Sequence, residues 1–344
     1  MRCTRPRTVG FKPDGKTICW SQKHASKEFA TFQLPCGKCL SCRLEYSRQW
    51  AIRCMHEASL HENNSFITLT YDDAHLGDNR LIYSHFQTFI KDLRDKIFRD
   101  YIKQHFGEGF WSSLSPDQKK QFRKDHKNEL DRLKISVFVT GEYGDKSQRM
   151  HWHALIFNWR PTDLVYKYSN DRGDKSYTSL TLTELWPHGN SELGQITFES
   201  AAYCARYAAK KLYHGRDQDH DLHPVSRKSS HSAIGKKFLE FYWRSIFSVG
   251  KIIHEGNTSP IPRYYEKWLA KHQPVYYQRY VTDKKSKIIQ EAHARETQNI
   301  KLENEVNAER KKHNPFSKHQ ISRTKVAEII LDQKFNQNRK NLKL

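Results

Sequence analysis

The sequence predicts an α+β domain built on an antiparallel sheet. Segments with the two-residue apolar alternation of strands are interspersed with segments that have the three- and four-residue apolar spacing of helices. Two of the expected strands are also adjacent in sequence and joined by turn-forming residues, as in a β-hairpin. Strands connected in this way favour an antiparallel sheet over a doubly wound parallel one.

The expected hairpin is formed by ISVFVTGEYG and MHWHALIFN, which end at Asn158. Both arms are rich in β-branched and aromatic residues, and GDKSQRM between them contains the turn formers. His151 and His153 are two residues apart in the second arm, so their side chains point to the same face. Two imidazoles on one face can converge on a single ion or phosphate.

Other elements are expected before the hairpin. The segment SFITLTYDD, Ser65 to Asp73, alternates as a strand should. It is followed by SHFQTFIKDLRDKIFRDY, an amphipathic helix for which Ser84 is the expected cap. The charged run KKQFRKDHKNELDRL is then expected to form a solvated helix or a loop insertion.

After the hairpin we expect a polar loop at 160–176, a strand GQITF, and a helix ESAAYCARYAAKKLY from Glu199 to Tyr213. The segment IPRYYEKWLAKH is expected to form a short helix after two prolines. The charged C-terminal tail has few apolar residues, so we expect it to be helical or partly disordered.

The composition favours a nucleic-acid partner. A net charge of +21 over 344 residues attracts polyanions, and abundant aromatic residues provide surfaces for base stacking. A solvated basic surface or a membrane-binding patch is the alternative. The chain contains no apolar run of about 18 residues and no signal peptide, so a cytosolic protein is expected. Seven cysteines in such a protein are expected to be reduced thiols.

Three cysteines lie three residues apart in PCGKCLSCR: Cys36, Cys39 and Cys42. Their spacing suits a structural zinc site, which usually needs four ligands. The candidates for the fourth ligand are Cys3, Cys19, Cys54, His24 and His56. The alternative is that the three thiols are small buried side chains at a tight turn.

A candidate divalent-metal site combines His151 and His153 with Glu142 in the preceding arm of the hairpin. Composition alone yields about one His-x-His in a chain with 19 histidines, so the pair by itself carries little weight. Two neutral imidazoles and a carboxylate would hold a divalent ion and leave positions open for a phosphate. The alternative is that both histidines are hydrogen-bonded strand residues.

The expected helix after GQITF provides a candidate nucleophile. Tyr203 and Tyr207 are four residues apart, so both phenols project from one helix face, and Lys210 joins that face. A tyrosine ester to a DNA phosphate would conserve the energy of the broken bond. The same spacing occurs at Tyr276 and Tyr280, and tyrosines so spaced also occur as amphipathic core residues.

At these residues the chain resembles the HUH endonucleases, the rolling-circle replication initiators. It is most similar to the replication initiation proteins of the microviruses, especially the gokushovirus branch. The similar stretches extend in order from about residue 35 to residue 265. They are PCGKCLSCR, FITLTYDD, TGEYGDKSQRMHWHALIFN, ELWPHG, GQITFESAAYCARYAAKK and IPRYY. Trp152, between the two histidines, is larger than the residue that the family usually has there.

The resemblance implies a sheet of about five mostly antiparallel strands flanked by helices. It also implies a Mg²⁺ or Mn²⁺ site, and nicking and rejoining of the viral origin through a 5′-phosphotyrosine in the host bacterial cytoplasm. Host DNA polymerase and helicase would be partners, and no membrane would be involved. The implied ligands are His151, His153 and, less directly, Glu142, and the implied catalytic residues are Tyr203, Tyr207 and Lys210.

We therefore expect three parts: a cysteine-containing segment at 1–60, an HUH endonuclease domain at 61–270, and a charged helical or disordered tail at 271–344. Two other functions fit the same residues. One is a non-catalytic basic DNA-binding or packaging protein with a structural zinc, and the other is an HUH transposase or relaxase.

Overall fold

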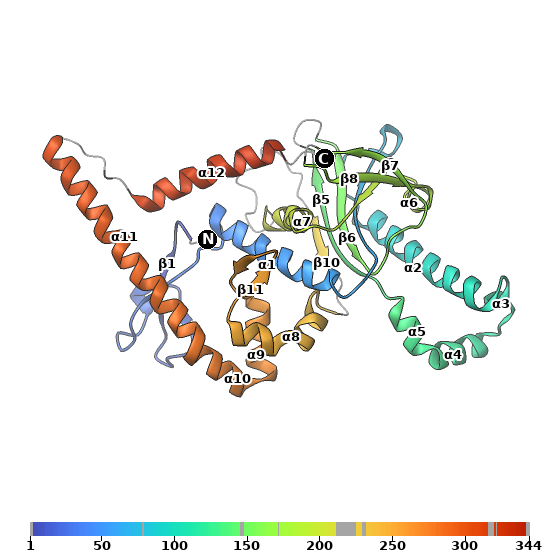
Figure 1. Ribbon diagram of the computed structural model, residues 1–344, viewed down its shortest axis with the longest axis horizontal. Coiled ribbons are helices and arrows are strands. Elements are labelled where there is room, and N and C mark those ends of the chain that lie inside the picture. Colours follow the sequence, from blue (N-terminus) through green and yellow to red (C-terminus); the bar gives the residue numbers. More distant parts are fainter. Residues whose placement is uncertain are drawn as a thin grey trace. The chain divides into compact units, whose positions relative to one another are not determined.

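The structure, a computed structural model, describes residues 3–77, 79–144, 148–170, 172–210, 225–228, 232–315, 320 and 322–341. It divides into two compact units (Figure 1). One unit, here called the sheet unit, is Trp50–Glu240, and the other, the terminal unit, combines Met1–Gln49 with Phe241–Leu344.

A seven-stranded sheet forms the centre of the sheet unit, in the order β10-β5-β6-β4-β9-β8-β7. Every neighbouring pair is antiparallel, which confirms the predicted α+β class. The strands are β4 (Asn64–Thr70), β5 (Ser136–Tyr143), β6 (Met150–Phe157), β7 (Leu164–Ser169), β8 (Lys175–Ser179), β9 (Ser191–Gly194) and β10 (Val225–Lys228).

The predicted hairpin is confirmed as β5 and β6. In its register Glu142 lies opposite His151, and Gly141 lies opposite Trp152. Because successive strand residues point to opposite faces, Trp152 leaves the histidine face and is fully buried on the other side. There its indole Nε1 donates a hydrogen bond to the Tyr71 hydroxyl at 3.0 Å. The bulky residue between the histidines therefore packs in the core and not in the histidine site.

Helices α2 (Tyr83–Phe106) and α6 (Leu180–Leu185) cover the Trp152 face of the sheet. The three- and four-residue spacing of apolar residues in α2 creates one buried stripe. It consists of Phe86, Phe89, Ile90 and Leu93. The predicted cap at Ser84 is wrong, because the helix begins after Ile82 and no side chain caps it. Tertiary packing of the stripe thus fixes this helix start without a capping side chain.

The histidine face is covered by α7 (Phe198–Lys210) and by α1 (Leu40–Ala58). Small side chains at Ala201, Cys204 and Ala205 are fully buried and let α7 pack closely on β5 and β6. From α1, the Trp50 ring packs on Phe138 with 5.1 Å between ring centroids. Figure 1 shows α7 and α2 on opposite sides of the strands.

Three expectations about the polar segments are corrected or refined. The segment 160–176, expected to be a loop, contains β7 and the start of β8. The expected strand GQITF is wrong, because β9 ends at Gly194. The charged run after α2 is helical, as one of its two interpretations held. Its helices are α3 (Phe110–Ser113), α4 (Pro116–Asp125) and α5 (Lys127–Arg132).

The terminal unit contains a small sheet in the order β2-β1-β3 and a β11–β12 hairpin. The expected short helix is confirmed as α9, and the described tail residues are largely helical. The strands are β1 (Arg7–Phe11), β2 (Ile18–Cys19), β3 (Phe32–Leu34), β11 (Ile252–His254) and β12 (Asn257–Ser259), and the helical segments are α9 (Arg263–His272), α10 (Pro274–Tyr280), the π-helix η4 (Val281–Lys285), α11 (Ser286–His313) and α12 (Arg323–Asn341).

Helix α8 (Lys236–Val249) contributes residues to both units, and the short 3₁₀ turns are η1 (Gln22–His24) and η2 (Asp73–His75). Every helix in the described part of the chain is too short or too polar to span a lipid bilayer.

Candidate active site

Glu142, His151 and His153 converge on the α7 side of the hairpin. One ligand atom from each lies within 4.8 Å of the other two. Strand pairing explains the geometry, because Glu142 is directly opposite His151 and two residues along the strand from the partner of His153. The sheet therefore brings together the three side chains that were predicted to hold a metal ion.

The carboxylate lies between the two rings. Glu142 Oε1 is 2.9 Å from Nε2 of His151 and 2.9 Å from Nε2 of His153. His151 Nδ1 faces the backbone carbonyl oxygen of Arg149 at 3.1 Å, so Nδ1 carries a hydrogen and donates it. His153 Nδ1 lies 3.0 Å from Thr68 Oγ1, and we assign its hydrogen to Nδ1 as well. Each ring then presents the lone pair of Nε2 to the carboxylate.

Burial and charge favour a bound cation at this point. Among the described residues, neither Glu142 Oε2 nor His153 Nε2, both buried, has a hydrogen-bond partner. Burial alone would raise the pKa of the Glu142 carboxyl, but the neighbouring imidazoles outweigh this and lower it to about 2. Burial lowers the pKa of the His153 imidazole, so the ring is neutral at neutral pH. A buried carboxylate with neutral imidazoles fits a divalent ion.

Tyr203 joins this group from α7. Its hydroxyl donates a hydrogen bond to Glu142 Oε1 at 2.7 Å. Its ring meets the His153 ring edge-on, with centroids 5.0 Å apart. The guanidinium of Arg206 lies 5.5 Å from the Tyr203 ring centroid. A phenol, a carboxylate and two imidazoles thus occupy one site, as expected for a tyrosine nucleophile beside a metal ion.

The other two residues predicted on this helix are resolved less fully. Tyr207 and Lys210 belong to α7, but their side chains lie outside the described residues, as do residues 211–213 of the expected helix. The helix is confirmed as far as Lys210, and the roles of these two side chains stay predictions.

The second tyrosine pair has structural partners within the terminal unit. Tyr276 packs edge-on against Trp243 with centroids 4.9 Å apart. The Tyr280 hydroxyl donates a hydrogen bond to Glu266 at 3.0 Å, and burial together with this carboxylate raises the pKa of Tyr280. Spacing alone did not separate this pair from the one in α7, whereas its contacts do.

Two residues of the site were missed in the sequence. Thr68 of β4 was detectable, since the strand FITLTYDD pairs with the histidine strand and Thr68 lies opposite His153. Arg206 carried no signal, because one arginine among 59 basic residues does not stand out. A different metal-ligand cluster forms at Cys36, Cys39 and Cys42, with Cys3 as fourth member.

Comparison with known proteins gives one full-length similarity and two partial ones. The chain is 42% identical to the "Replication-associated protein VP4" of Bdellovibrio phage phiMH2K over 347 residues, 100% of both chains. It is 34% identical to the "Replication-associated protein ORF4" of Chlamydia phage 1 over 254 residues, 72% of this chain and 56% of that one. It is 27% identical to the "Replication-associated protein ORF2" of Spiroplasma virus 4 over 310 residues, 84% and 87% of the two chains.

A family model for replication-associated proteins of the ORF2 type matches residues 112–212, a range that contains the histidine hairpin and α7. No solved structure matches the chain.

Proposed function

The chain belongs to the phage replication-associated proteins, and on this basis we propose that it initiates rolling-circle replication by nicking and rejoining single-stranded DNA at the viral origin. The observation that carries the proposal is the hydrogen bond from Tyr203 to Glu142, the carboxylate that lies between His151 and His153. This arrangement puts a nucleophilic oxygen next to a cation site, as phosphoryl transfer requires.

Glu142, His151 and His153 would hold the divalent ion, for which we propose Mg²⁺ or Mn²⁺. When bound, the ion would polarise a phosphoryl oxygen and offset the negative charge that develops during attack. The protein itself orients the ligands, since the hydrogen bonds of His151 to Arg149 and of His153 to Thr68 fix the direction of both Nε2 lone pairs.

In the proposed reaction the Tyr203 oxygen attacks the phosphorus at the origin, and the bond from phosphorus to the 3′-oxygen breaks. The phenol hydrogen, directed at Glu142, leaves as the new bond forms, and the departing oxygen takes up a proton to become a 3′-hydroxyl. The product is a 5′-phosphotyrosine that conserves the energy of the phosphodiester. Host DNA polymerase would extend the 3′-hydroxyl, with a host helicase opening the duplex.

We assign the second transfer to Tyr207 and contact with the neighbouring phosphate to Lys210. They lie about one and two turns of α7 beyond Tyr203, so all three project from one side of the helix. After one round of synthesis, attack by the second tyrosine on the regenerated origin would free the 3′-hydroxyl that closes the circle.

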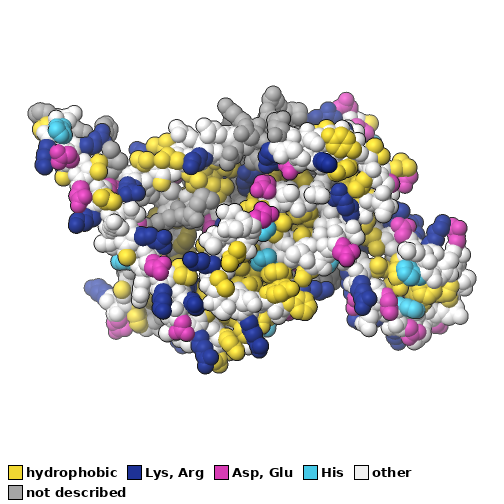
Figure 2. All heavy atoms as spheres, in the orientation of Figure 1, with side chains coloured by type: hydrophobic (Ala, Val, Ile, Leu, Met, Phe, Trp, Pro, Cys, Tyr) yellow, Lys and Arg dark blue, Asp and Glu magenta, His cyan; other side chains and the backbone are white. Residues whose placement is uncertain are grey.

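The basic surface supports DNA as the substrate. Figure 2 shows Lys and Arg scattered over many elements of the face it draws. Within the sheet unit, basic side chains also gather along a groove beside α2, α4 and α5. We call it the basic groove, and its Lys and Arg residues are Arg94, Lys120, Arg123, Lys124, Lys127, Arg132, Lys134, Lys228 and Lys237.

The test is the formation of a covalent adduct between the purified protein and origin-bearing single-stranded DNA, with Mg²⁺ or Mn²⁺. Wild type is expected to give a DNA-linked band in a denaturing gel, and mass spectrometry is expected to find the link on α7. Tyr203→Phe with Tyr207→Phe should abolish the band, whereas Tyr276→Phe, a matched control in the other tyrosine pair, should retain it.

His151→Ala with His153→Ala should also abolish the adduct but leave most of the salt-dependent DNA binding, because many basic residues contribute phosphate contacts. An adduct that persists in the tyrosine double variant would overturn the assignment. Wild type that binds DNA but gives no adduct with either metal would instead indicate a non-catalytic DNA-binding protein.

A further inference from the structure

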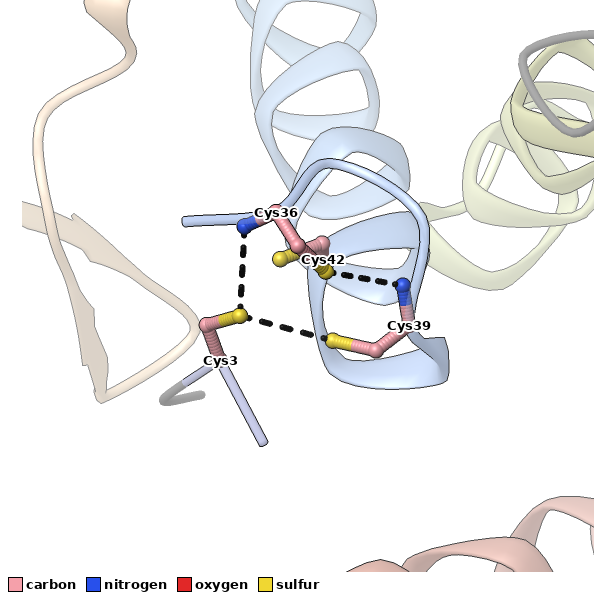
Figure 3. A group of neighbouring side chains, drawn as sticks. All are labelled: Cys3, Cys36, Cys39 and Cys42. Carbon is pink, nitrogen blue, oxygen red and sulfur yellow. Dashed lines mark hydrogen bonds between the residues drawn. The ribbon is translucent and has the colours of Figure 1, made fainter. Parts of the chain in front are cut away.

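Four cysteines form a cluster in the terminal unit, separate from the residues of the proposed nicking reaction. Cys36, Cys39 and Cys42 come from the turn that begins α1 and from its first residues, and Cys3 comes from the segment before β1. All four Sγ atoms lie within 4.8 Å of one another. Figure 3 shows the four side chains directed at a common point.

The distances fit one tetrahedral ion. With a zinc–sulfur bond of about 2.3 Å, a regular tetrahedron places its sulfurs about 3.8 Å apart. The Sγ atoms of Cys3 and Cys39 are 3.7 Å apart. This is too far for a disulfide, whose sulfurs are about 2.05 Å apart, and all seven cysteines are free thiols. Multi-iron clusters hold their ligands farther apart than a single ion does, so the packing of the sulfurs favours one ion.

Backbone hydrogen bonds also suit thiolates. The N–H groups of Lys38 and Cys39 donate to Cys36 Sγ at 3.4 and 3.3 Å, and the N–H of Cys36 donates to Cys3 Sγ at 3.3 Å. Two of these bonds are drawn in Figure 3. The turn that aims both N–H groups at Cys36 has Gly37 at φ +74°, in the left-handed region that favours glycine. Donors of this kind stabilise negative charge on sulfur.

Burial separates this cluster from ordinary packing thiols. Cys3 and Cys36 are only partly buried, whereas Cys54 and Cys204 are fully buried in the sheet unit. A small hydrophobic side chain gains most when it is fully removed from water, so partly exposed thiols gathered at one point are not explained by packing.

We propose that Cys3, Cys36, Cys39 and Cys42 bind one structural zinc ion, which joins the N-terminal segment to the start of α1. Cys3 precedes β1 and Cys36 follows β3, so the ion closes the small sheet at both ends. In the described part of 3–35 the buried apolar side chains are those of Val9 and Cys19. So small a core rarely maintains a fold without a metal or a disulfide.

The first measurement is the metal content of the full-length protein after dialysis against a weak chelator. We expect one zinc per chain in wild type and in Cys19→Ser, a control in the same segment. Cys3→Ser and Cys42→Ser should lose most of it. Zinc below stoichiometry in wild type, iron in place of zinc, or an equal loss in Cys19→Ser would each overturn the proposal.

A second measurement needs no cysteine variant, so it stays decisive if those variants fail to fold. Protein in which cobalt replaces the metal should show the intense visible and near-ultraviolet absorption of tetrahedral cobalt bound to thiolates. The same spectrum should persist in His151→Ala with His153→Ala, because histidine and carboxylate ligands lack the sulfur charge-transfer bands. Loss of the bands in that variant, or their absence in wild type, would assign the metal elsewhere.

Discussion

Thr68 determines which nitrogen of His153 faces Glu142. Its hydroxyl lies 3.0 Å from Nδ1, so the opposite nitrogen is left to point at the carboxylate. The histidine pair and Glu142 were predictable because strand periodicity alone puts alternate residues on one face. Thr68 needed the pairing of β4 with β6, which joins residues 85 positions apart and has no local signature. Partners of this kind often determine how well a first ligand works.

Thr68→Val should weaken metal binding while leaving the fold intact. Valine has nearly the shape of threonine but cannot hold the Nδ1 hydrogen, so we expect affinity for Mn²⁺ to fall about 10- to 100-fold. Calorimetric titration with Mn²⁺ measures this. Thr70→Val is the matched control on the same strand, since the Thr70 hydroxyl bonds the backbone of Asn190 instead. Equal affinities for wild type and Thr68→Val would contradict the assigned tautomer.

Gly141→Ala should destabilise the sheet unit from the face opposite the metal site. An added Cβ would lie 2.6 Å from the buried Trp152 ring, so the ring must move within a close-packed core. We expect a loss of about 1–3 kcal/mol in the free energy of unfolding, measured by urea denaturation. Gly194→Ala, whose Cβ would meet only a carbonyl oxygen at 3.4 Å, should cost less. A Gly194→Ala variant as unstable as Gly141→Ala would argue against this cause.

At the scale of elements, those with a strong apolar period were predictable and those defined by polar pairing were not. Helix α2 and the β5–β6 hairpin bury a clear stripe or face. Strand β7 is mostly exposed, and its polar sequence is indistinguishable from a loop until Tyr168 and Ser176 bond to Glu192 of β9. Because Thr197 and Ser200 bond reciprocally at the start of α7, the residues after Gly194 become the turn into that helix and not a strand.

Glu57→Gln should loosen the contact between α1 and the segment before α8. The buried Glu57 carboxylate accepts the Gly235 N–H at 2.7 Å, and Arg53 donates to the Ile234 carbonyl. Because a hydrogen bond to a buried charge is involved, we expect a loss of about 1.5–3 kcal/mol in unfolding free energy at neutral pH. Urea denaturation measures it, with the exposed Glu62→Gln as the control for the same change of charge.

The effect of Glu57 should depend on pH. Burial raises the pKa of Glu57, but the His61 side chain and the Gly235 N–H together lower it further, so in the folded state it lies below its ordinary value. The stabilisation is therefore complete above the unfolded pKa and is lost as pH falls through the folded one. The difference between wild type and Glu57→Gln should shrink on acidification, and a difference that grows instead would contradict this explanation.

At the scale of the whole molecule, the sequence predicted a polyanionic partner but not where it binds. A charge of +21 is a sum over the chain, and it contains no information on which basic residues are neutralised by acidic neighbours. The structure makes that distinction. On α2, Lys96 pairs with Asp100 and Lys103 with Glu108, whereas Lys120 and Lys124 of α4 are exposed and line the basic groove. Only part of the total charge is thus placed where it could meet a phosphate backbone.

Lys120→Gln with Lys124→Gln should therefore weaken duplex DNA binding more than Lys96→Gln with Lys103→Gln, although both remove two charges. If each groove lysine neutralises one phosphate, the slope of log affinity against log salt should become shallower by about 0.9 per lysine. Fluorescence anisotropy at several salt concentrations measures the slope. Adduct formation on a short single-stranded origin should be retained, because Tyr203 and Glu142 are unchanged. Equal slopes for the two variants would show that the basic groove does not contact DNA.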